Sequence, residues 1–124
     1  MRIMIVDDDE ISLDILTNAL RFSNHDTAVF LSPLDAWNEF SADPKKIDLV
    51  IVDYHMPGMS GLMLHEKIQA IAPATPVILI SGVAGSEIEA AFIAKGGKGF
   101  LAKPVDLGKL DELIRQIETE RWQK

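Results

Sequence analysis

Side chains that could take part in chemistry follow four short apolar runs: Asp7 and Asp8 after one run, then Asp53, Ser81 and Lys103 each after another. Carboxylates about 4 Å apart repel each other by roughly 1 kcal/mol in water and by about 4 kcal/mol at an effective dielectric constant of 20. Three acids brought together would therefore raise a pKa, move apart or bind a cation. Mg²⁺ fits best, because it accepts one or two carboxylates and keeps water molecules that a phosphate can replace. The lack of cysteine and of a histidine pair at ligand spacing disfavours zinc.

Asp53 could also react covalently, since carboxylate nucleophiles that form aspartyl phosphates are an established strategy. With Mg²⁺ bound, the three acids and Lys103 would sum to a charge near zero, and a phosphoryl group on Asp53 would leave about −1. Ser81 could then donate a hydrogen bond to one phosphoryl oxygen, and Lys103 could pair with another. This chemistry requires that the fold bring the residues together.

Each of these residues also has an ordinary structural explanation when it is taken alone. The acids 7–10 are typical of a helix start, Ser81 of a turn, and Lys103 of a solvated surface. A parallel sheet changes this view, because it places the carboxyl ends of all its strands along one edge.

The hydrophobic pattern predicts such a sheet, with strands expected at 2–6, 27–31, 49–53, 76–81 and 99–102. Helices are expected at 10–22, 33–43, 62–71, from 86 to the glycines at 96–97, and from 106 onward. Short crossovers of this kind require parallel strands in right-handed βαβ units. We therefore expect an α/β, doubly wound, flavodoxin-like fold with five strands and five helices, for which 2-1-3-4-5 is a common strand order.

The apolar spacing also predicts which helix residues face the core. Ile11, Ile15, Leu16, Ala19 and Leu20 recur at helical spacing in the first helix. In the second and third helices the expected inward residues are Leu34, Trp37, Phe40, Leu64 and Ile68.

Length and composition indicate one globular domain spanning residues 1–124. The net charge is −7, all of it in residues 1–44, and no basic stripe is present, so direct nucleic-acid binding is not expected. The apolar run that ends at Val6 is too short for a signal peptide or a membrane span. We expect a cytoplasmic protein that does not bind membranes.

Five motifs in order along the chain resemble the receiver domain of two-component response regulators, the CheY-like family. The motifs are Asp7-Asp8, Asp53, Met56-Pro57-Gly58-Met59-Ser60-Gly61, Ser81 and Phe100-Leu101-Ala102-Lys103-Pro104. The resemblance implies that Asp53 accepts a phosphoryl group from the phosphohistidine of a sensor histidine kinase or of a histidine phosphotransfer protein. It also implies a signalling phosphoacceptor that catalyses only its own phosphorylation and a slow autodephosphorylation.

The resemblance further implies a role for each site residue. Asp8, Asp53 and the backbone carbonyl of His55 would hold Mg²⁺, and Asp7 would help through water. Ser81 would be the switch hydroxyl, Phe100 the switch aromatic residue and Lys103 the cation that pairs with phosphate. The Lys103–Pro104 peptide bond would be cis.

Output in this family would follow from movement of Ser81 and of the loop after it. Phe100 would then turn inward and change the face formed by the helix from 86, the strand 99–102 and the last helix. The chain ends after that helix, so we expect the signal to pass to a protein partner, a homodimer or a further phosphotransfer.

Three positions near the expected site bear on how long a phosphoryl group would last. Gly82 stands where Ala is frequent in the family, and it would widen access to the phosphate. Val83 offers no polar group to orient water, which suggests a longer-lived phosphoryl state. His55 could act in the opposite direction.

Three other functions agree less well with the sequence. A haloacid-dehalogenase-type phosphatase would need a second acid two residues after the nucleophile, where His55 stands, and an acidic pair where Pro104-Val105 follow Lys103. A flavin site would need a Ser/Thr/Gly-rich loop after the first strand, where four acids stand instead. A degenerate receiver that serves only as an interaction module would have no need to keep all the acids, Ser81 and Lys103.

Overall fold

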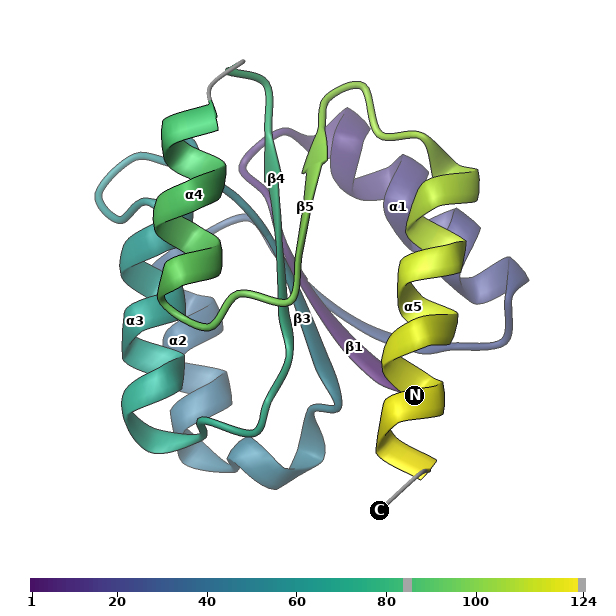
Figure 1. Ribbon diagram of the computed structural model, residues 1–124, viewed down its shortest axis with the longest axis horizontal. Helices are drawn as coiled ribbons and strands as arrows, with labels where there is room; N and C mark the ends of the chain where they lie inside the picture. The colour runs from purple at the N-terminus through teal and green to yellow at the C-terminus, as the bar shows by residue number, and fades with distance from the viewer. Residues whose placement is uncertain (84–85, 123–124) are drawn as a thin grey trace.

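The computed structural model describes residues 1–83 and 86–122, and it contains a five-stranded parallel sheet in the order β2-β1-β3-β4-β5 (Figure 1). The strands are β1 (Arg2–Val6), β2 (Asp26–Phe30), β3 (Leu49–Asp53), β4 (Val77–Ser81) and β5 (Gly99–Ala102). The fold class and the strand order predicted from the sequence are therefore confirmed. β2 begins and ends one residue earlier than expected, and β4 begins one residue later.

The helices cover both faces of the sheet. Their bounds are α1 (Glu10–Phe22), α2 (Pro33–Ala42), α3 (Gly61–Ile71), α4 (Ser86–Ala94) and α5 (Leu107–Trp122), with a short 3-10 helix, η1 (Pro44–Lys46), before β3. One buried cluster joins α1 and α5 to one face of the sheet, and a second joins α2, α3 and α4 to the other face (Figure 1). No helix in the described part of the chain is long and apolar enough to cross a membrane.

The central strands are buried on both faces, which explains their unbroken apolar runs. Alternate residues point to opposite sides, so Ile51 joins the cluster under α1 and α5 while Val52 joins the cluster under α2 to α4. The register pairs Val6 with Val52 and Asp53 with Ile80. Because neighbouring strands end at the same level, the polar residues that follow them lie along one edge of the sheet.

Two helices differ from the prediction in which residues face inward. In α1 the buried residues are Leu13, Leu16 and Leu20, whereas Ile11 and Ile15 are 72% and 53% exposed. In α2, Leu34 is also exposed, while Phe40 is buried as expected. The sequence carries two overlapping apolar stripes on α1, and only contact with β1 and α5 decides which stripe is buried.

Candidate functional site

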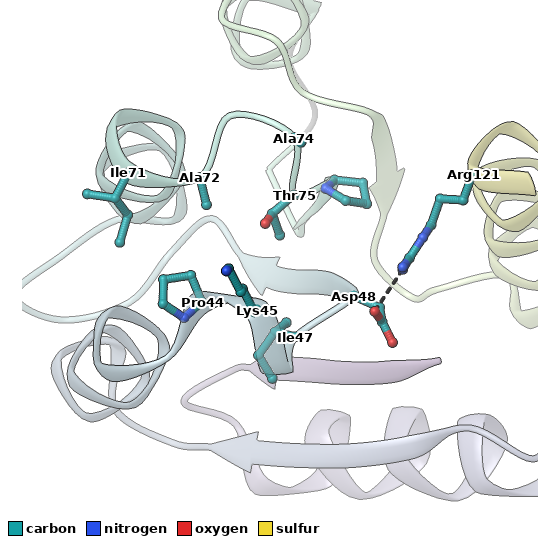
Figure 2. Close-up of a pocket in the computed structure, with 10 residues that line it drawn as sticks. Pro44, Lys45, Ile47, Asp48, Ile71, Ala72, Ala74, Thr75 and Arg121 are labelled. Carbon is teal, nitrogen blue, oxygen red and sulfur yellow. Dashed lines mark ion pairs between the residues drawn. The ribbon is translucent and has the colours of Figure 1, made fainter. Parts of the chain in front are cut away.

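One pocket of the structure contains none of the predicted site residues (Figure 2). It has a volume of about 460 Å³ and lies between η1, the turn before β4 and the end of α5. An ion pair at 2.9 Å joins Arg121 of α5 to Asp48, which precedes β3, at this pocket (Figure 2). This is the amino-terminal edge of the sheet, so the pocket lies away from the carboxyl ends of the strands.

Three carboxylates meet at the carboxyl-terminal edge. Asp7 and Asp8 follow β1, Asp53 ends β3, and each offers an oxygen within 4.8 Å of the others. Asp7 and Asp53 are 1% and 5% exposed, while Asp8 is open to solvent. The parallel register therefore brings together acids that lie 46 and 45 positions apart in the sequence.

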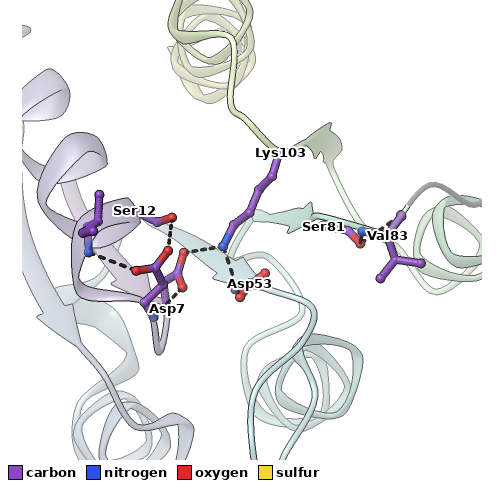
Figure 3. A network of polar contacts seen from close by, with 8 residues as sticks. Asp7, Ser12, Asp53, Ser81, Val83 and Lys103 are labelled. Carbon is purple, nitrogen blue, oxygen red and sulfur yellow. Dashed lines mark hydrogen bonds and ion pairs between the residues drawn. The ribbon is translucent and has the colours of Figure 1, made fainter.

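Lys103 reaches this acidic cluster from the turn after β5. Its Nζ lies 3.0 Å from Oδ2 of Asp7 and 3.3 Å from Oδ2 of Asp53, so the ammonium group stands between the two carboxylates (Figure 3). The other oxygen of Asp7 accepts a hydrogen bond from the backbone N–H of Asp9 at 3.0 Å. The peptide bond between Lys103 and Pro104 is cis, as expected from the resemblance.

Burial and the neighbouring charges shift the pKa values of Asp53 and Lys103. Burial, reinforced by the charge of Asp7, raises the pKa of the Asp53 carboxyl group, and Lys103 offsets only part of that increase. Burial alone would lower the pKa of Lys103, but its pairing with Asp7 and Asp53 raises the pKa above its ordinary value. One ammonium group therefore does not neutralise this set of acids.

The donor set fits a hard divalent cation. It offers three carboxylate oxygens close together, one of them from an exposed residue, which leaves room for water or phosphate beside the ion. The raised pKa of Asp53 means that added positive charge would stabilise its ionised form. His55, whose backbone carbonyl was predicted as a further ligand, lies two residues beyond Asp53.

Ser81 ends β4 beside this cluster but is turned away from it. Its hydroxyl donates a hydrogen bond to the carbonyl of Val83 and accepts one from the N–H of Val83, both at 3.1 Å (Figure 3). The backbone N–H of Lys103 donates to the carbonyl of Ser81 at 2.8 Å, which fixes the two residues side by side. The structure thus places Ser81 at the site with its hydroxyl engaged in its own turn.

Phe100 lies on β5, which β4 separates from the strand of Asp53, and it faces the side of the sheet covered by α2, α3 and α4. It is partly exposed and packs against the edge of the buried cluster there. Its partner in the β4–β5 register is Leu79, two residues before Ser81. Phe100 therefore does not touch the acids, and any link to them runs through β4.

The loop after Asp53 is held against the end of β3. The N–H of Gly61 donates to the carbonyl of Tyr54 at 2.9 Å. A Cβ atom at Gly61 would lie 2.5 Å from the backbone oxygen of Asp53 and 2.7 Å from Cδ1 of Leu79, so the start of α3 can approach the site this closely only with glycine. The N–H of Met63 donates a hydrogen bond to the hydroxyl oxygen of Ser60, which caps α3.

A second pocket, of about 490 Å³, opens beside Lys103 and was not predicted from the sequence. Its lining is largely apolar and comes from α1 and from both loops that follow β4 and β5: Ser12, Ile15, Leu16, Gly82, Lys103, Pro104 and Val105. Ile15 contributes to it because it belongs to the exposed stripe of α1. The excess of apolar positions on α1, more than one buried face needs, was the signal that could have revealed it.

Comparison with known proteins indicates one domain family. The family model described as the response regulator receiver domain matches residues 3–115. The C4-dicarboxylate transport transcriptional regulatory protein DctD of Rhizobium meliloti is 33% identical over 119 residues, which cover 96% of this chain and 25% of DctD. The chain spans 16% to 25% of the length of three curated relatives that include DctD.

Solved structures show the same likeness. A CheY-like receiver domain protein from Methanospirillum hungatei matches with a TM-score of 0.89 and 25% identity, covering 99% of this chain and 98% of that protein. A response regulator receiver protein from Pseudomonas putida matches with a TM-score of 0.84 and 31% identity, covering 93% of this chain and 95% of that protein.

Proposed function

Because the chain belongs to the response regulator receiver domain family of two-component systems, we propose that Asp53 accepts a phosphoryl group from a phosphohistidine. The donor would be a sensor histidine kinase or a histidine phosphotransfer protein, and residues 1–124 would act as one receiver domain. The observation that carries the proposal is the buried Asp53 carboxylate beside two further acids and the Lys103 ammonium group.

The transfer exchanges one bond to phosphorus for another. An oxygen of the Asp53 carboxylate attacks the phosphorus, an O–P bond forms and the P–N bond of the donor breaks, with its electron pair left on the imidazole nitrogen. Because Asp53 is held at the end of a buried strand, it is already positioned for attack. The later loss of phosphate is hydrolysis of this acyl phosphate by water.

The charge that spreads over the phosphoryl oxygens needs positive partners. Lys103 stands 3.3 Å from Asp53 and can pair with one of these oxygens. Asp8, Asp53 and the backbone carbonyl of His55 would hold Mg²⁺, with Asp7 assisting through water. When bound, this ion would neutralise the acids and the phosphoryl oxygens.

Ser81 would report the arrival of the phosphoryl group. Its hydroxyl now makes neutral hydrogen bonds with Val83, each worth about 0.5–1.5 kcal/mol net, whereas a hydrogen bond to a charged group is worth about 1.5–3 kcal/mol. A phosphoryl oxygen on Asp53 can therefore draw Ser81 and its loop toward the site. β4 would transmit this movement to Phe100 and to the face formed by α4, β5 and α5, where a partner or a second copy would bind.

The pocket beside Lys103 is the place where we expect the phosphodonor domain to dock. It joins an apolar surface, which includes Ile15 and Val105, to the cation that faces Asp53. A domain seated there would bring its phosphohistidine to the open side of the acids. In this proposal the chain is a signalling phosphoacceptor, and its only reactions are its own phosphorylation and autodephosphorylation.

Intact mass spectrometry after incubation with Mg²⁺ and a small acyl phosphate tests the proposal. We expect wild type to gain the mass of one phosphoryl group, and Asp53→Asn to gain none. Asp14→Asn, which removes an exposed acid from α1, is the matched control and should be phosphorylated like wild type. An unmodified wild type would refute the phosphoacceptor role, and rapid turnover of unrelated phosphate esters would favour a phosphatase.

A further inference from the structure

The helices α3 and α4 lie on the face of the sheet away from α1 and α5 (Figure 1). A buried histidine joins these two helices. His65 of α3 is completely buried, and its ring lies 4.7 Å from the ring of Phe92 of α4, centroid to centroid. Phe92 in turn fills the space above Gly97, where a Cβ atom would lie 2.2 Å from the ring. These three residues form a continuous contact from α3 through α4 to the turn before β5.

A side-chain amide completes this contact. Nε2 of Gln69 lies 3.0 Å from Nε2 of His65 and 3.4 Å from the carbonyl oxygen of Gly96, which follows α4. An amide nitrogen only donates and a carbonyl oxygen only accepts. The opposite orientation of the amide would set its own oxygen against that of Gly96, so Gln69 donates to both partners.

This arrangement defines the form of the imidazole ring. Nε2 of His65 must accept, so a neutral ring carries its proton on Nδ1. Nδ1 is buried and has no hydrogen-bond partner among residues 1–83 and 86–122. A proton added at Nε2 would face the donor of Gln69, and turning the amide to relieve this clash would break the hydrogen bond to Gly96.

The charges around His65 do not favour an imidazolium ion. Glu66 of α3 and Lys95, just after α4, act on it with opposite signs and form an ion pair with each other. β4 and β5 contain no ionisable side chain. The other charged groups of the neighbouring helices lie elsewhere. Asp35 and Glu39 of α2 line pockets beside β2, and Lys67 lies over the ring of Trp37. Glu87 and Glu89 of α4 are exposed in its first turn, whereas Phe92 is near its end. Burial is the largest effect, and it lowers the pKa of His65.

We propose that His65 makes the α3–α4 contact sensitive to pH: the neutral ring and Gln69 hold the end of α4, and protonation releases it. The unfolded or opened chain binds a proton more readily than the closed one, so stability of the contact rises with pH and falls below the ordinary histidine pKa of about 6.5. If the α4–β5–α5 face is the output surface, acidification would change that face without phosphorylation; this consequence alone rests on the proposed function.

Two NMR measurements on unphosphorylated protein test the inference. The first is the imidazole ¹⁵N spectrum at neutral pH, where we expect a neutral His65 ring with its proton on Nδ1. The second is amide exchange of Lys95 and Gly97, whose N–H groups are bonded to carbonyls of α4. We expect their protection factors to fall by up to about tenfold per pH unit below pH 6.5.

Variants assign this pH dependence to one residue. His65→Leu should abolish it, whereas His25→Gln, which removes a partly buried histidine elsewhere, should leave it unchanged. The same pH dependence in His65→Leu would overturn the inference. A proton on Nε2 of His65 in wild type would also overturn it, and this result does not require that the variant fold. Neither measurement requires phosphorylation, so this inference and the role of Asp53 can fail separately.

Discussion

At the scale of single residues, Asp53 is buried at the end of β3 next to Asp7, and both conditions raise the pKa of its carboxyl group. The folded state therefore holds its proton more tightly than the unfolded state does. The resulting destabilisation is absent below the unfolded pKa, near 3.8, and is complete above the raised folded pKa. The ionised Asp53 carboxylate therefore lowers the stability of the folded protein, and a positively charged partner would offset this effect.

Asp53→Asn is accordingly expected to stabilise the metal-free protein at pH 7, by roughly 1 kcal/mol. Lys103 keeps its 3.0 Å ion pair with Asp7 in this variant, so the cation is not left alone. Urea unfolding at pH 7 and at pH 3.5 measures the effect, which should shrink at the lower pH. Asp14→Asn should show no such gain, and a destabilised Asp53→Asn at pH 7 would contradict this account.

We expect the side chain of Val83 to influence how long Asp53 stays phosphorylated. It is half exposed, its backbone bonds the hydroxyl of Ser81, and its side chain cannot orient water. Val83→Glu should speed loss of phosphate from Asp53, by up to about 10²-fold, the lower end of what a positioned acid–base group contributes. Decay of the phosphorylated mass measures the rate, with Val83→Ile as the apolar control. A slower Val83→Glu variant would count against the hypothesis.

At the scale of elements, the approach of α3 to the end of β3 depends on Gly61. A methyl group there would lie 2.5 Å from the backbone oxygen of Asp53, so Gly61→Ala must displace either the helix or the strand end. We expect a loss of about 1–3 kcal/mol in the free energy of unfolding, together with slower phosphorylation of Asp53. Denaturant unfolding and mass spectrometry measure the two effects.

Gly82→Ala is the matched control for this change. Its nearest contact would be 3.9 Å from the side chain of Lys103, an ordinary separation, so we expect a change in stability within about 0.5 kcal/mol. If Gly61→Ala were tolerated equally well, close packing of α3 on the site would not be what requires glycine at that position.

At the scale of the whole molecule, the sheet was predictable because each central strand is an unbroken apolar run closed by a polar residue. The bounds of β3 and β5 agree with the prediction for the same reason, and those of α1 agree because its apolar residues recur at helical spacing. The side of α1 that faces inward was not predictable, since Ile11 and Ile15 extend an apolar stripe that only tertiary contacts resolve. The sequence also contained no sign that His65, one of three scattered histidines, would be buried against Phe92.

The geometry of the site was also predictable only in part. The convergence of Asp7, Asp53 and Lys103 follows from parallel topology, which places strand ends together whatever their distance in sequence. The direction of the Ser81 hydroxyl does not, because it depends on the turn at Val83. Strand pattern therefore predicts which residues meet, and loop conformation determines how they are engaged.

Coupling across the molecule should depend on Ser81, which lies between Asp53 and the α4–β5–α5 face. Phosphorylation of wild type should change hydrogen exchange in α4 and β5, while α2, on the opposite side of α3, serves as the internal reference. Ser81→Ala loses both hydrogen bonds with Val83, yet Asp53 and Lys103 keep their places, so this variant should still gain a phosphoryl group. Its exchange response in α4 and β5 should fall to less than half that of wild type, because no hydroxyl remains to follow the phosphate. A full response in phosphorylated Ser81→Ala would show that the signal reaches this face by another route.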